Sequence, residues 1–540
     1  MSPERSACSL RVTTAPQAAL RDARAIAHGI PSFTLMAQAG TQSAAAILRD
    51  HRHRLAHGVA VFAGTGNNGG DAWMVAAQLA RAGVRVRVVT AGAPRTADAQ
   101  QAAALAHALP HDTGRLTVEP PTGAERLVVD GLLGTGHTGA FRDTLLPLVR
   151  QLAAVRAAGA TVIALDLPSG MDAATGVCCA GSVPAEVTHS YGTVKRGLLL
   201  NRPAAGRILL LDIGLGDHAG GEPGDTAWET PAAHDLAAWL PSLPWDAHKG
   251  RRAHLALVGG ADGMSGAIAL ATRGALASGI GLAHAWVASP ASAMLSAAVP
   301  QAITHAWPNA GAPDAPHGHA LAMGPGLGRE ARARDLLVNT LAANPGVPAV
   351  LDADALTLLA LGAATTGHEA DTPTVAAQLR AWAGERPLVL TPHPGEFARL
   401  MGGPVPTDWE ARGARVQQYA DATGATILLK GTPTLIASPG HAAVTVVGRG
   451  TALLATGGSG DLLTGIVGTL LAQQLPPHRA AVLAATVHGL AAESATAAYG
   501  TTRGPDLSAV VAQLPAAWRA IAHPAPLPPG VLAEWPSVGT

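Results

Sequence analysis

The chain has 540 residues but only three cysteines, Cys8, Cys178 and Cys179, which is too few for the disulfide framework of a small secreted domain. Aromatic residues are also scarce at 3%, which predicts a core of Ala, Val and Leu. Neither sign of charge is in excess, because Lys plus Arg and Asp plus Glu both number 37. Nucleic-acid-binding proteins usually show a basic excess or a basic stripe, so no nucleic-acid partner is expected.

Long apolar runs are missing as well. None reaches the roughly 18 residues that a membrane-spanning helix requires, and segment 1–17 lacks the apolar centre of a signal peptide. With the few cysteines, these features predict a soluble, cytoplasmic protein that does not bind membranes. The length and the 48% hydrophobic content suit two large α/β domains better than one.

Short β-branched runs alternate with helical patterns in two series, which predicts two mostly parallel sheets covered by helices. After a helical region at 11–57, the first series extends from GVAVFA at 58–63 to RILLLD at 207–212. The second begins with HLALVGG at 254–260 and ends in helices from about 456 to 522. We therefore expect a domain at 1–215, a linker rich in Gly, Pro and acidic residues at 216–245, a domain at 246–522 and an irregular tail at 523–540.

Polar residues follow three predicted strands of the first series, at the sheet edge where ligands bind in parallel α/β folds. GVAVFA leads into GTGNNGGD, RLVVD into GLLGTGHTG, and TVIALD into LPSG. The glycine-rich turns can bind phosphate through their backbone N–H groups. Side-chain oxygens are supplied by Asn67, Asn68, Asp130, Asp166 and Ser169. A simple dinucleotide-binding fold would need an acidic residue after the second strand, which ends instead in VTAG at 89–92.

Five segments together resemble the NAD(P)HX epimerase family, the YjeF N-terminal domain, over most of residues 10–215. They are GIPSFTLMAQAG (29–40), GTGNNGGD (64–71), DGLLGTGHTG (130–139), DLPSGMDAATG (166–176) and VTHSYGTVKRGLL (187–199). The resemblance implies a Rossmann-like three-layer domain that binds the hydrated nicotinamide nucleotide NAD(P)HX and a potassium ion. It assigns potassium to Asn68, Asp130 and Ser169. It assigns the substrate to Asn67, Asn68, Gly69, Gly70, Asp71, Gly134, Thr135, Gly136, His137, Thr138, Gly139, Ala140 and Asp166.

The epimerase inverts the hydroxyl-bearing carbon of the hydrated nicotinamide ring, and we expect the Asp166 carboxylate to move protons as the hydroxyl leaves and returns. Asp71 is expected either to cap the following helix or to meet the ligand. The chain departs from the family at GGDAW, where GGDG is usual, so Ala72 and Trp73 are expected to narrow the pocket. It also has AQAG where ERAG or QRAG is commoner, which we interpret as packing.

The strongest signal in the second series is ATGGSGDLLTG at 455–465, a glycine-rich turn that opens a helix and can bind an anion. Asp461 within it is placed to accept a proton from a hydroxyl that attacks a phosphoryl group. TPHPGE, ILLKGTPT, LDADAL and MGPGLG stand at other predicted strand ends. His393 is a candidate ligand contact, although a lone histidine is often structural. No Cys or His spacing in the sequence is typical of zinc.

These motifs, with KGRRAHLALVGGADGMSGAIALATRGALASGIGL at 249–282, resemble the ribokinase-like NAD(P)HX dehydratase, the YjeF C-terminal domain, over about 245–520. The resemblance implies that ADP, or ATP, phosphorylates the ring hydroxyl with magnesium present, and that phosphate then leaves. It assigns the hydrated cofactor to Ala267, Gly326, His393 and Asp461, with Asp461 as base. It assigns the adenine nucleotide to Lys430, Gly431, Thr432, Pro433, Thr434 and Gly460. We add Asp352 or Asp354 as supporting carboxylates.

The sequence thus predicts a bifunctional metabolite-repair enzyme, an isomerase fused to a lyase, in which the epimerase supplies the epimer that the dehydratase accepts. Two alternatives stay open. One is a vitamin or sugar kinase with a nucleotide-binding accessory domain, and the other is a non-catalytic N-terminal binding or assembly module. A homo-oligomer is expected from the family. The choices between ADP and ATP, and between NADHX and NADPHX, stay open.

Overall fold

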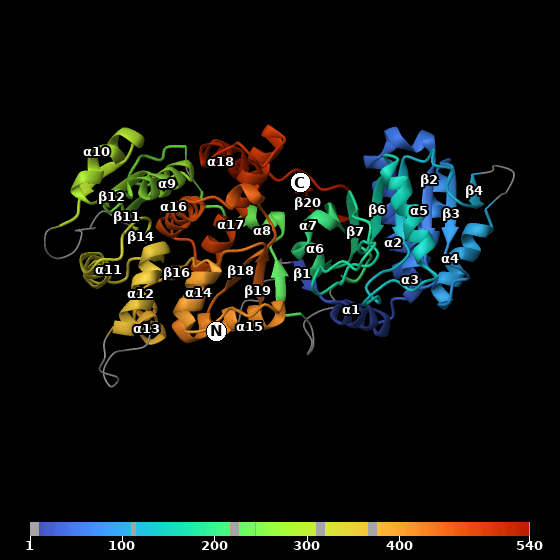
Figure 1. Cartoon of the computed structure of the whole chain (residues 1–540), viewed down its shortest axis with the longest axis horizontal. Coiled ribbons are helices and arrows are strands. Elements are labelled where there is room, and N and C mark those ends of the chain that lie inside the picture. Colours follow the sequence, from blue (N-terminus) through green and yellow to red (C-terminus); the bar gives the residue numbers. More distant parts are fainter. Residues whose placement is uncertain are drawn as a thin grey trace. The chain divides into compact units, whose positions relative to one another are not determined.

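The computed structural model describes residues 10–109, 115–216, 226–242, 245–308, 319–365 and 375–538. The chain forms two compact units. The N-terminal unit comprises Leu10–Trp228 and Pro526–Val538, and the C-terminal unit comprises Glu229–Ala525. Each is built from a mostly parallel sheet and covering helices, so the predicted α/β class is confirmed (Figure 1). Among the described residues, no helix has both the length and the apolar character needed to cross a bilayer.

The sheet of the N-terminal unit has the strand order β20-β9-β7-β6-β5-β2-β3-β4. Its strands are β2 (Val59–Ala63), β3 (Val86–Thr90), β4 (Leu116–Val118), β5 (Leu127–Gly131), β6 (Thr161–Leu165), β7 (Val187–Tyr191), β9 (Arg207–Leu211) and β20 (Val531–Trp535). The chain proceeds outward from β2 to β4 and then returns to place β5 on the other side of β2. This reversal makes the crevice between β2 and β5 the expected ligand position of the fold.

Helices cover both faces of this sheet, and the two sides of β2 show why its sequence is apolar throughout. Val59 and Val61 belong to the core under α2, α3 and α4, whereas Ala60 and Phe62 belong to the core under α5. The helices are α1 (Ala15–Ala27), α2 (Ser32–Asp50), α3 (Asn67–Arg81), α4 (Ala97–His107), α5 (Leu146–Ala157), α6 (Arg196–Leu200) and α7 (Arg202–Ala205), with a 3₁₀ turn at Arg52–His57. A short parallel pair joins β1 (Leu10–Thr13) to β8 (Val194–Lys195).

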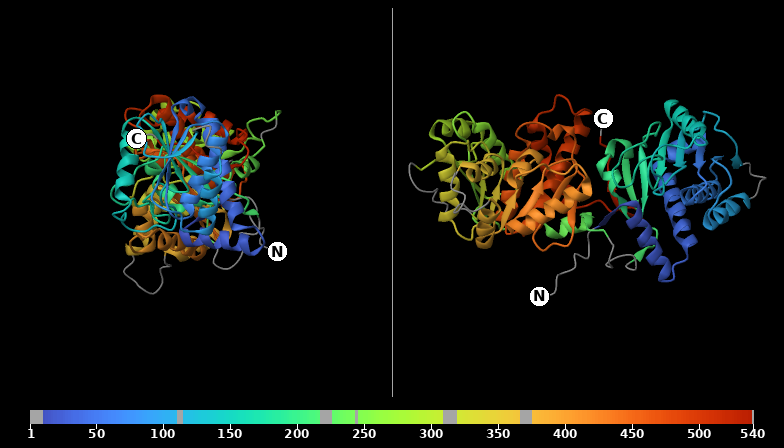
Figure 2. Two further views of the ribbon diagram at one scale, coloured as in Figure 1. Left: turned by 90° about the vertical axis from the view of Figure 1, so that its right-hand side faces the viewer. Right: turned by 60° about the horizontal axis from the view of Figure 1, so that its bottom comes forward.

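The C-terminal tail is not irregular as the sequence predicted. Residues Val531–Trp535 form β20, which pairs antiparallel with β9 at the edge of the N-terminal unit's sheet (Figure 2). Val531 and Trp535 are buried, and Arg207 donates a hydrogen bond to Glu534 at 2.7 Å. The C-terminal unit is therefore inserted between two neighbouring strands of the N-terminal unit.

The segment expected to be a linker also contains regular structure. Strand β10 (Trp228–Thr230) and helix α8 (Ala233–Trp239) lie within 216–245. Residues 217–225 and 243–244 of that segment, and Cys8, lie outside the described residues.

In the C-terminal unit, the strands pair in the order β13-β12-β11-β14-β15-β16-β17-β18-β19. Strands β11 (His254–Val258), β12 (Leu282–Val287), β13 (Ile303–Ala306), β14 (Ala320–Met323), β15 (Ala349–Leu351), β16 (Leu388–Leu390) and β17 (Thr426–Leu429) are parallel, and β18 (Thr434–Ala437) and β19 (Val444–Val447) are antiparallel. The parallel strands therefore end at one edge, where MGPGLG, LDADAL, TPHPGE and KGTPT follow β14, β15, β16 and β17.

One face of this sheet packs against α16 (Ser459–Ala472), whose apolar residues Leu462, Ile466 and Leu470 are buried with Leu255 and Ala322 of the sheet. The remaining helices are α9 (Ser265–Ala277), α10 (Ser289–Ala298), α11 (Ala331–Ala343), α12 (Ala353–Thr365), α13 (Val375–Glu385), α14 (Pro394–Met401), α15 (Trp409–Thr423), α17 (Pro477–Tyr499) and α18 (Leu507–Ala522). This packing holds the first turn of α16, which contains Asp461, at the edge where the loops gather.

Candidate active sites

A cavity of about 620 Å³ lies at the predicted position in the N-terminal unit, between the ends of β2 and β5. Its wall includes Asn67, Asn68 and Gly69 at the start of α3, and Gly134, Thr135, Gly136 and His137 after β5. Asp71 and Asp166 also line it, whereas Gly70, Thr138, Gly139 and Ala140 do not. The strand ends that carried the sequence motifs therefore meet in one cavity.

Of the three side chains expected to hold potassium, Asn68 and Ser169 contact the backbone of Leu133, and Asp130 is joined to them through Ser169. Asn68 Nδ2 donates to the Leu133 carbonyl at 2.9 Å, and the Leu133 amide donates to Ser169 Oγ at 3.0 Å. Ser169 Oγ in turn donates to Asp130 Oδ1 at 2.6 Å. Asn68 Oδ1 is buried and has no hydrogen-bond partner among the described residues. Burial raises the pKa of Asp130, although hydrogen bonds from Ser169 act in the opposite direction.

Asp166 forms a buried ion pair with Lys195, which the sequence reasoning did not single out. Asp166 follows β6 with a φ of 64°, a left-handed conformation that is rare outside glycine. The Lys195 ammonium also donates to the carbonyl of Tyr191 at 2.9 Å, and only 3% of its side chain is exposed. The turn after β7 thus places the Lys195 ammonium against the Asp166 carboxylate, the group that was predicted to move protons.

Two further carboxyl groups surround this ion pair. Asp71 does not cap α3, because the N-cap residue is Gly66 and makes no side-chain cap hydrogen bond. Burial, followed by the negative charges of Asp166 and Asp22, raises the pKa of Asp71 well above its usual value. Burial also raises the pKa of Asp22, while Lys195 lowers it. The cavity therefore contains protonatable carboxyl groups beside an ion pair, a composition suited to proton transfer.

The GGDAW departure does not narrow the cavity. Ala72 and Trp73 are both buried in the core under α3 and neither lines the cavity wall. Trp73 packs against the ring of His107 at a centroid distance of 5.0 Å. Ala72 faces Gly131, where an added Cβ would approach the Ala72 methyl to 2.6 Å. The expected effect of these two residues on the pocket is therefore wrong, because the helix turns them toward the core.

In the C-terminal unit, Asp352 and Lys430 link three loops at the sheet edge. Lys430 Nζ, after β17, lies 2.7 Å from Asp352 Oδ1, after β15. Thr464 of α16 donates to Asp352 Oδ2 at 2.7 Å. An added Cβ on Gly460 would lie 3.0 Å from Lys430 Nζ, so the amine sits directly beneath the first turn of α16.

Asp461 lies next to this buried pair. Burial, and then the negative charge of Asp352, raise the pKa of Asp461 to about 7, and Lys430 opposes the shift. Burial alone would lower the pKa of Lys430, but Asp352 and Glu396 raise it above its usual value. A carboxyl group with a pKa near neutrality at a helix N-terminus is suited to general base chemistry.

His393 has a structural role that its sequence did not reveal. As the N-cap of α14, its Nδ1 accepts hydrogen bonds from the amides of Gly395 at 3.0 Å and Glu396 at 3.3 Å. Glu396 completes the capping box by accepting from the His393 amide at 2.8 Å. The same oxygen, Glu396 Oε2, lies 3.9 Å from Lys430 Nζ. His393 remains half-exposed beside the charged cluster.

The remaining predicted residues fall at the same edge or support it. Gly326 faces Ala267 at the start of α9, since an added Cβ would lie 3.1 Å from the Ala267 methyl. Asp354 accepts hydrogen bonds from the Gly328 amide at 3.0 Å and from Arg329 at 2.9 Å, so it orders the MGPGLG loop. The nucleotide motif Lys430, Gly431, Thr432, Pro433 and Thr434 spans the turn from β17 to β18.

Several site residues were missed by the sequence reasoning. They are Asp22, Tyr191, Thr193 and Lys195 in the N-terminal cavity, and Glu396 and Thr464 beside Lys430. Lys195 lies in the segment VTHSYGTVKRGLL and Glu396 in TPHPGE, both of which carried the family resemblance. A charged residue shortly after a predicted strand could therefore have identified both. Asp22 lies in the middle of α1, outside every motif that the sequence analysis identified, so nothing in the sequence marked it as a site residue.

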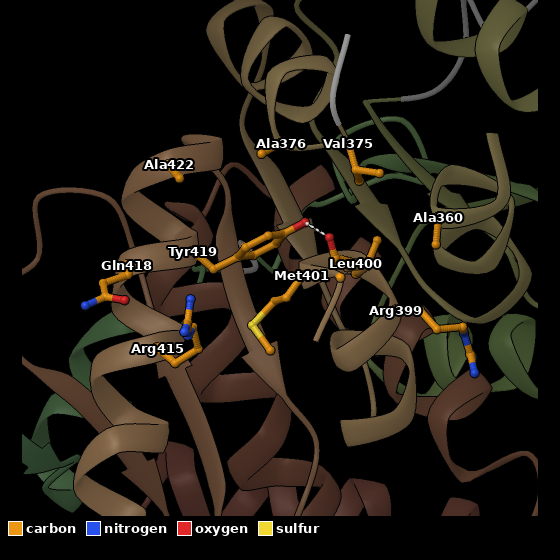
Figure 3. Close-up of a pocket in the computed structure, with 11 residues that line it drawn as sticks. Ala360, Val375, Ala376, Arg399, Leu400, Met401, Arg415, Gln418, Tyr419 and Ala422 are labelled. Atoms are coloured by element: carbon orange, nitrogen blue, oxygen red, sulfur yellow. Dashed lines mark hydrogen bonds between the residues drawn. The ribbon is translucent and has the colours of Figure 1, made fainter. Parts of the chain in front are cut away.

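A separate cavity of about 580 Å³ in the C-terminal unit contains none of the predicted site residues. It lies at the far end of α14 from His393, and its wall includes Arg399, Arg415 and Tyr419. Figure 3 shows the Tyr419 hydroxyl directed at Leu400, whose carbonyl it meets at 3.4 Å. Cavity size alone therefore does not identify the site in this unit.

Two family models match the chain, one for each half. The model described as YjeF-related protein N-terminus matches residues 32–197, and the model described as NAD(P)H-hydrate dehydratase matches residues 255–513. A bifunctional NAD(P)H-hydrate repair enzyme Nnr of Salinibacter ruber is 37% identical over 88% of this chain and 90% of its own length. The Escherichia coli enzyme of the same name is 30% identical over 88% of this chain and 87% of its own.

Among solved structures, the ADP/ATP-dependent NAD(P)H-hydrate dehydratase of Bacillus subtilis, co-crystallised with ATP/Mg²⁺, is 26% identical. It covers 54% of this chain and 97% of its own, with a TM-score of 0.44. The full-length relatives carry the identification, since both halves and their order match. The chain belongs to the family of bifunctional NAD(P)H-hydrate repair enzymes, with a YjeF-related epimerase half followed by an NAD(P)H-hydrate dehydratase half.

Proposed function

We propose that the N-terminal unit interconverts the two epimers of hydrated NAD(P)H and that the C-terminal unit uses ADP to remove water from the S form, giving NAD(P)H, AMP and phosphate. The observation that supports this most directly is Asp461, whose pKa of about 7 places a base at the opening of α16 beside Lys430. The cavity with Asp166 and Lys195 supports the first step.

For the epimerase, we assign the proton exchange to Asp166, which gives a proton to the hydroxyl as it leaves as water and takes one back when water adds to the other face of the ring. Lys195 fixes the position of the Asp166 carboxyl group. The ammonium is itself held by the Tyr191 and Thr193 carbonyls, at 2.9 and 3.4 Å. Burial and the neighbouring carboxylates raise the pKa of Asp71 well above its usual value, which favours the form of its carboxyl group that can donate a hydrogen bond to the substrate. Both carboxyl groups line one cavity, so a bound ring can meet them together.

The residues around Leu133 fit a potassium ion. Asn68 Oδ1 is buried without a partner among the described residues. Asn68 and Ser169 contact the same Leu133 backbone, and Ser169 donates to the Asp130 carboxylate. An ion held by Asn68, Asp130 and Ser169 would supply positive charge next to the loops that carry the nucleotide phosphates. We expect epimerase activity to depend on potassium, and Asn68→Ala to weaken that dependence.

For the dehydratase, Asp461 accepts the proton of the ring hydroxyl as the hydroxyl oxygen attacks the terminal phosphorus of ADP. The bond from that phosphorus to AMP breaks as the phosphate ester forms. The ester then loses phosphate, which is a better leaving group than hydroxide, and the neighbouring ring carbon releases a proton to water, which restores the ring double bond of NAD(P)H. Lys430 and the backbone amides at the start of α16 stabilise the phosphate charge. Ala267, Gly326 and His393 would contact the hydrated cofactor, and 431–434 with Gly460 the adenine nucleotide.

Magnesium would arrive with the nucleotide, since it prefers phosphate oxygens and water to protein cages. The Asp352 carboxylate is already occupied by Lys430 and Thr464. Assembly into a homo-oligomer stays a prediction.

Chemically prepared hydrated NADH, incubated with the full-length protein, ADP, Mg²⁺ and K⁺, tests the function through the absorbance of the dihydronicotinamide. Conversion of both epimers is expected. Conversion that stops after one epimer would leave the N-terminal half as a binding module, and no recovery would favour a kinase that acts on another alcohol. Parallel assays with ATP and with hydrated NADPH decide the two open preferences.

A further inference from the structure

Three side chains outside both candidate active sites come together in the C-terminal unit. Glu229 lies on β10, His441 in the turn between β18 and β19, and His478 in the first turn of α17. One carboxylate oxygen and two imidazole nitrogens from these residues all lie within 4.8 Å of one another. In the part of the chain that the structure describes, no other group of three His, Cys, Asp or Glu side chains is this close.

The distances within the group match those between ligands on a single ion. His441 Nε2 lies 3.1 Å from Glu229 Oε1. Two ligands at zinc bond lengths of about 2.0–2.2 Å stand about 3.3–3.6 Å apart around a tetrahedral ion, so a shift of a few tenths of an ångström would bring this pair to that separation. Thr445 Oγ1 lies 3.1 Å from Glu229 Oε1 and 3.1 Å from His478 Nε2, so one hydroxyl is shared between the carboxylate and the imidazole.

Outer contacts orient the His478 ring. Its Nδ1 lies 2.9 Å from Ser438 Oγ, which lies 2.9 Å from Thr426 Oγ1. A hydroxyl on Nδ1 turns Nε2 toward Glu229 and Thr445, as partners of metal-bound histidines commonly do. The His441 ring stacks on His478 with centroids 4.1 Å apart, which restrains the second imidazole.

The environment favours metal binding and allows access. Glu229 is buried, and the His478 side chain is held by hydrogen bonds at both ring nitrogens. The His441 side chain is 29% exposed. Ser438 and His478 also line a cavity of about 500 Å³. A metal ion can therefore reach a preformed set of one carboxylate and two imidazoles.

We propose that Glu229, His441 and His478 bind a divalent transition-metal ion of the zinc class at a site separate from both active sites. Imidazole ligands suit Zn²⁺, Co²⁺, Ni²⁺ and Cu²⁺, whereas potassium and magnesium prefer oxygen, so this site differs in chemistry from the ions of the proposed reactions. Three protein ligands leave a coordination position for water. The ion joins β10, the turn after β18 and α17, segments that are far apart in the sequence.

Untagged full-length protein, treated with EDTA and then dialysed, provides the test. Titration with Co²⁺ should give visible d–d absorption that saturates at one ion per chain, and Zn²⁺ should displace the Co²⁺ and raise the Tm. Glu229→Gln and His441→Gln should each abolish the signal. Ser438→Ala, which removes the hydroxyl on His478 Nδ1, should weaken binding about 10- to 100-fold.

A second histidine group supplies the control. His254, His284, His305 and His319 lie close together around β11, β12 and β13, with His284 Nδ1 3.1 Å from His305 Nε2. His319→Gln should bind Co²⁺ as the unaltered protein does. Absence of Co²⁺ binding at micromolar ion concentration, or binding that survives His441→Gln but not His319→Gln, would overturn the proposal. Because the His441 side chain is partly exposed, its variant should fold, which circular dichroism and the dehydratase rate of the apo form check.

Discussion

At the scale of single residues, the ionisation of Asp461 sets the pH range of the dehydratase. Its pKa is about 7 because of burial and the nearby Asp352 carboxylate, so only the deprotonated fraction can act as base. We expect kcat/KM for dehydration to rise about tenfold per pH unit below about pH 7 and to level off above it. Asp461→Asn should reduce the dehydratase rate by about 10²–10⁴-fold and leave epimerisation unchanged. A flat pH profile through neutrality would contradict the assignment.

The same pKa shift has a consequence for stability that separates loss of chemistry from loss of folding. A carboxyl group whose folded pKa is raised destabilises the folded state progressively as pH rises from its ordinary value, about 4, to its folded value. Asp461→Asn removes that penalty. The Tm of the variant should therefore exceed that of the unaltered protein above pH 7, and the difference should vanish toward pH 4, as measured by calorimetry. An inactive variant with a lowered Tm at all pH values would indicate misfolding instead.

Lys195 provides the corresponding test in the epimerase. Removing one member of a buried ion pair leaves the other unpaired, which typically destabilises a protein by about 3–5 kcal/mol. We expect Lys195→Met to slow epimerisation by about 10²–10⁴-fold, measured by the interconversion of the two epimers. The double variant Asp166→Asn with Lys195→Met should recover stability without recovering activity. If the double variant is as active as the unaltered protein, neither residue takes part in the reaction.

At the scale of secondary-structure elements, β20 links the end of the chain to the N-terminal unit. Trp535 is 4% exposed and Leu532 is 38% exposed on the same strand, so the two residues make a matched pair. Trp535→Ala should destabilise the N-terminal unit by about 3–5 kcal/mol, and Leu532→Ala by about 0.5 kcal/mol or less. Hydrogen exchange of β9 amides measures the effect locally. Equal protection of β9 in both variants would show that β20 does not stabilise the sheet.

Elements also show what the sequence could and could not predict. The short apolar runs that form β2, β5 and β6 were predicted because buried parallel strands have mostly hydrophobic sequences. Strands β1, β4 and β20 were missed. β1 and β4 have only four and three residues, too few to show that pattern, and β20 follows a proline-rich segment. The polar and glycine-rich residues that follow the strands predicted most of the wall of the N-terminal cavity. The Asp166–Lys195 pair was not predicted, since it depends on how the turn after β7 returns to β6.

At the scale of the whole molecule, the two reactions are assigned to groups that share no residue, one set in each compact unit. The product of the first reaction is a stable small molecule that can diffuse between proteins. An equimolar mixture of the Lys195→Met and Asp461→Asn proteins should therefore restore rapid conversion of both epimers of hydrated NADH with ADP, whereas neither variant alone should convert both epimers at that rate. Under these conditions Lys195→Met alone should convert the S form and then follow the slow spontaneous epimerisation of the R form, and Asp461→Asn alone should give almost no NADH. The absorbance of dihydronicotinamide measures all three.

Dilution of the mixture at a constant protein ratio should slow the recovery without changing its final extent, because diffusion and not contact between the variants connects the steps. A mixture that recovers no more than Lys195→Met alone would show that each site needs the other within one chain, and the assignment of independent sites would then be wrong.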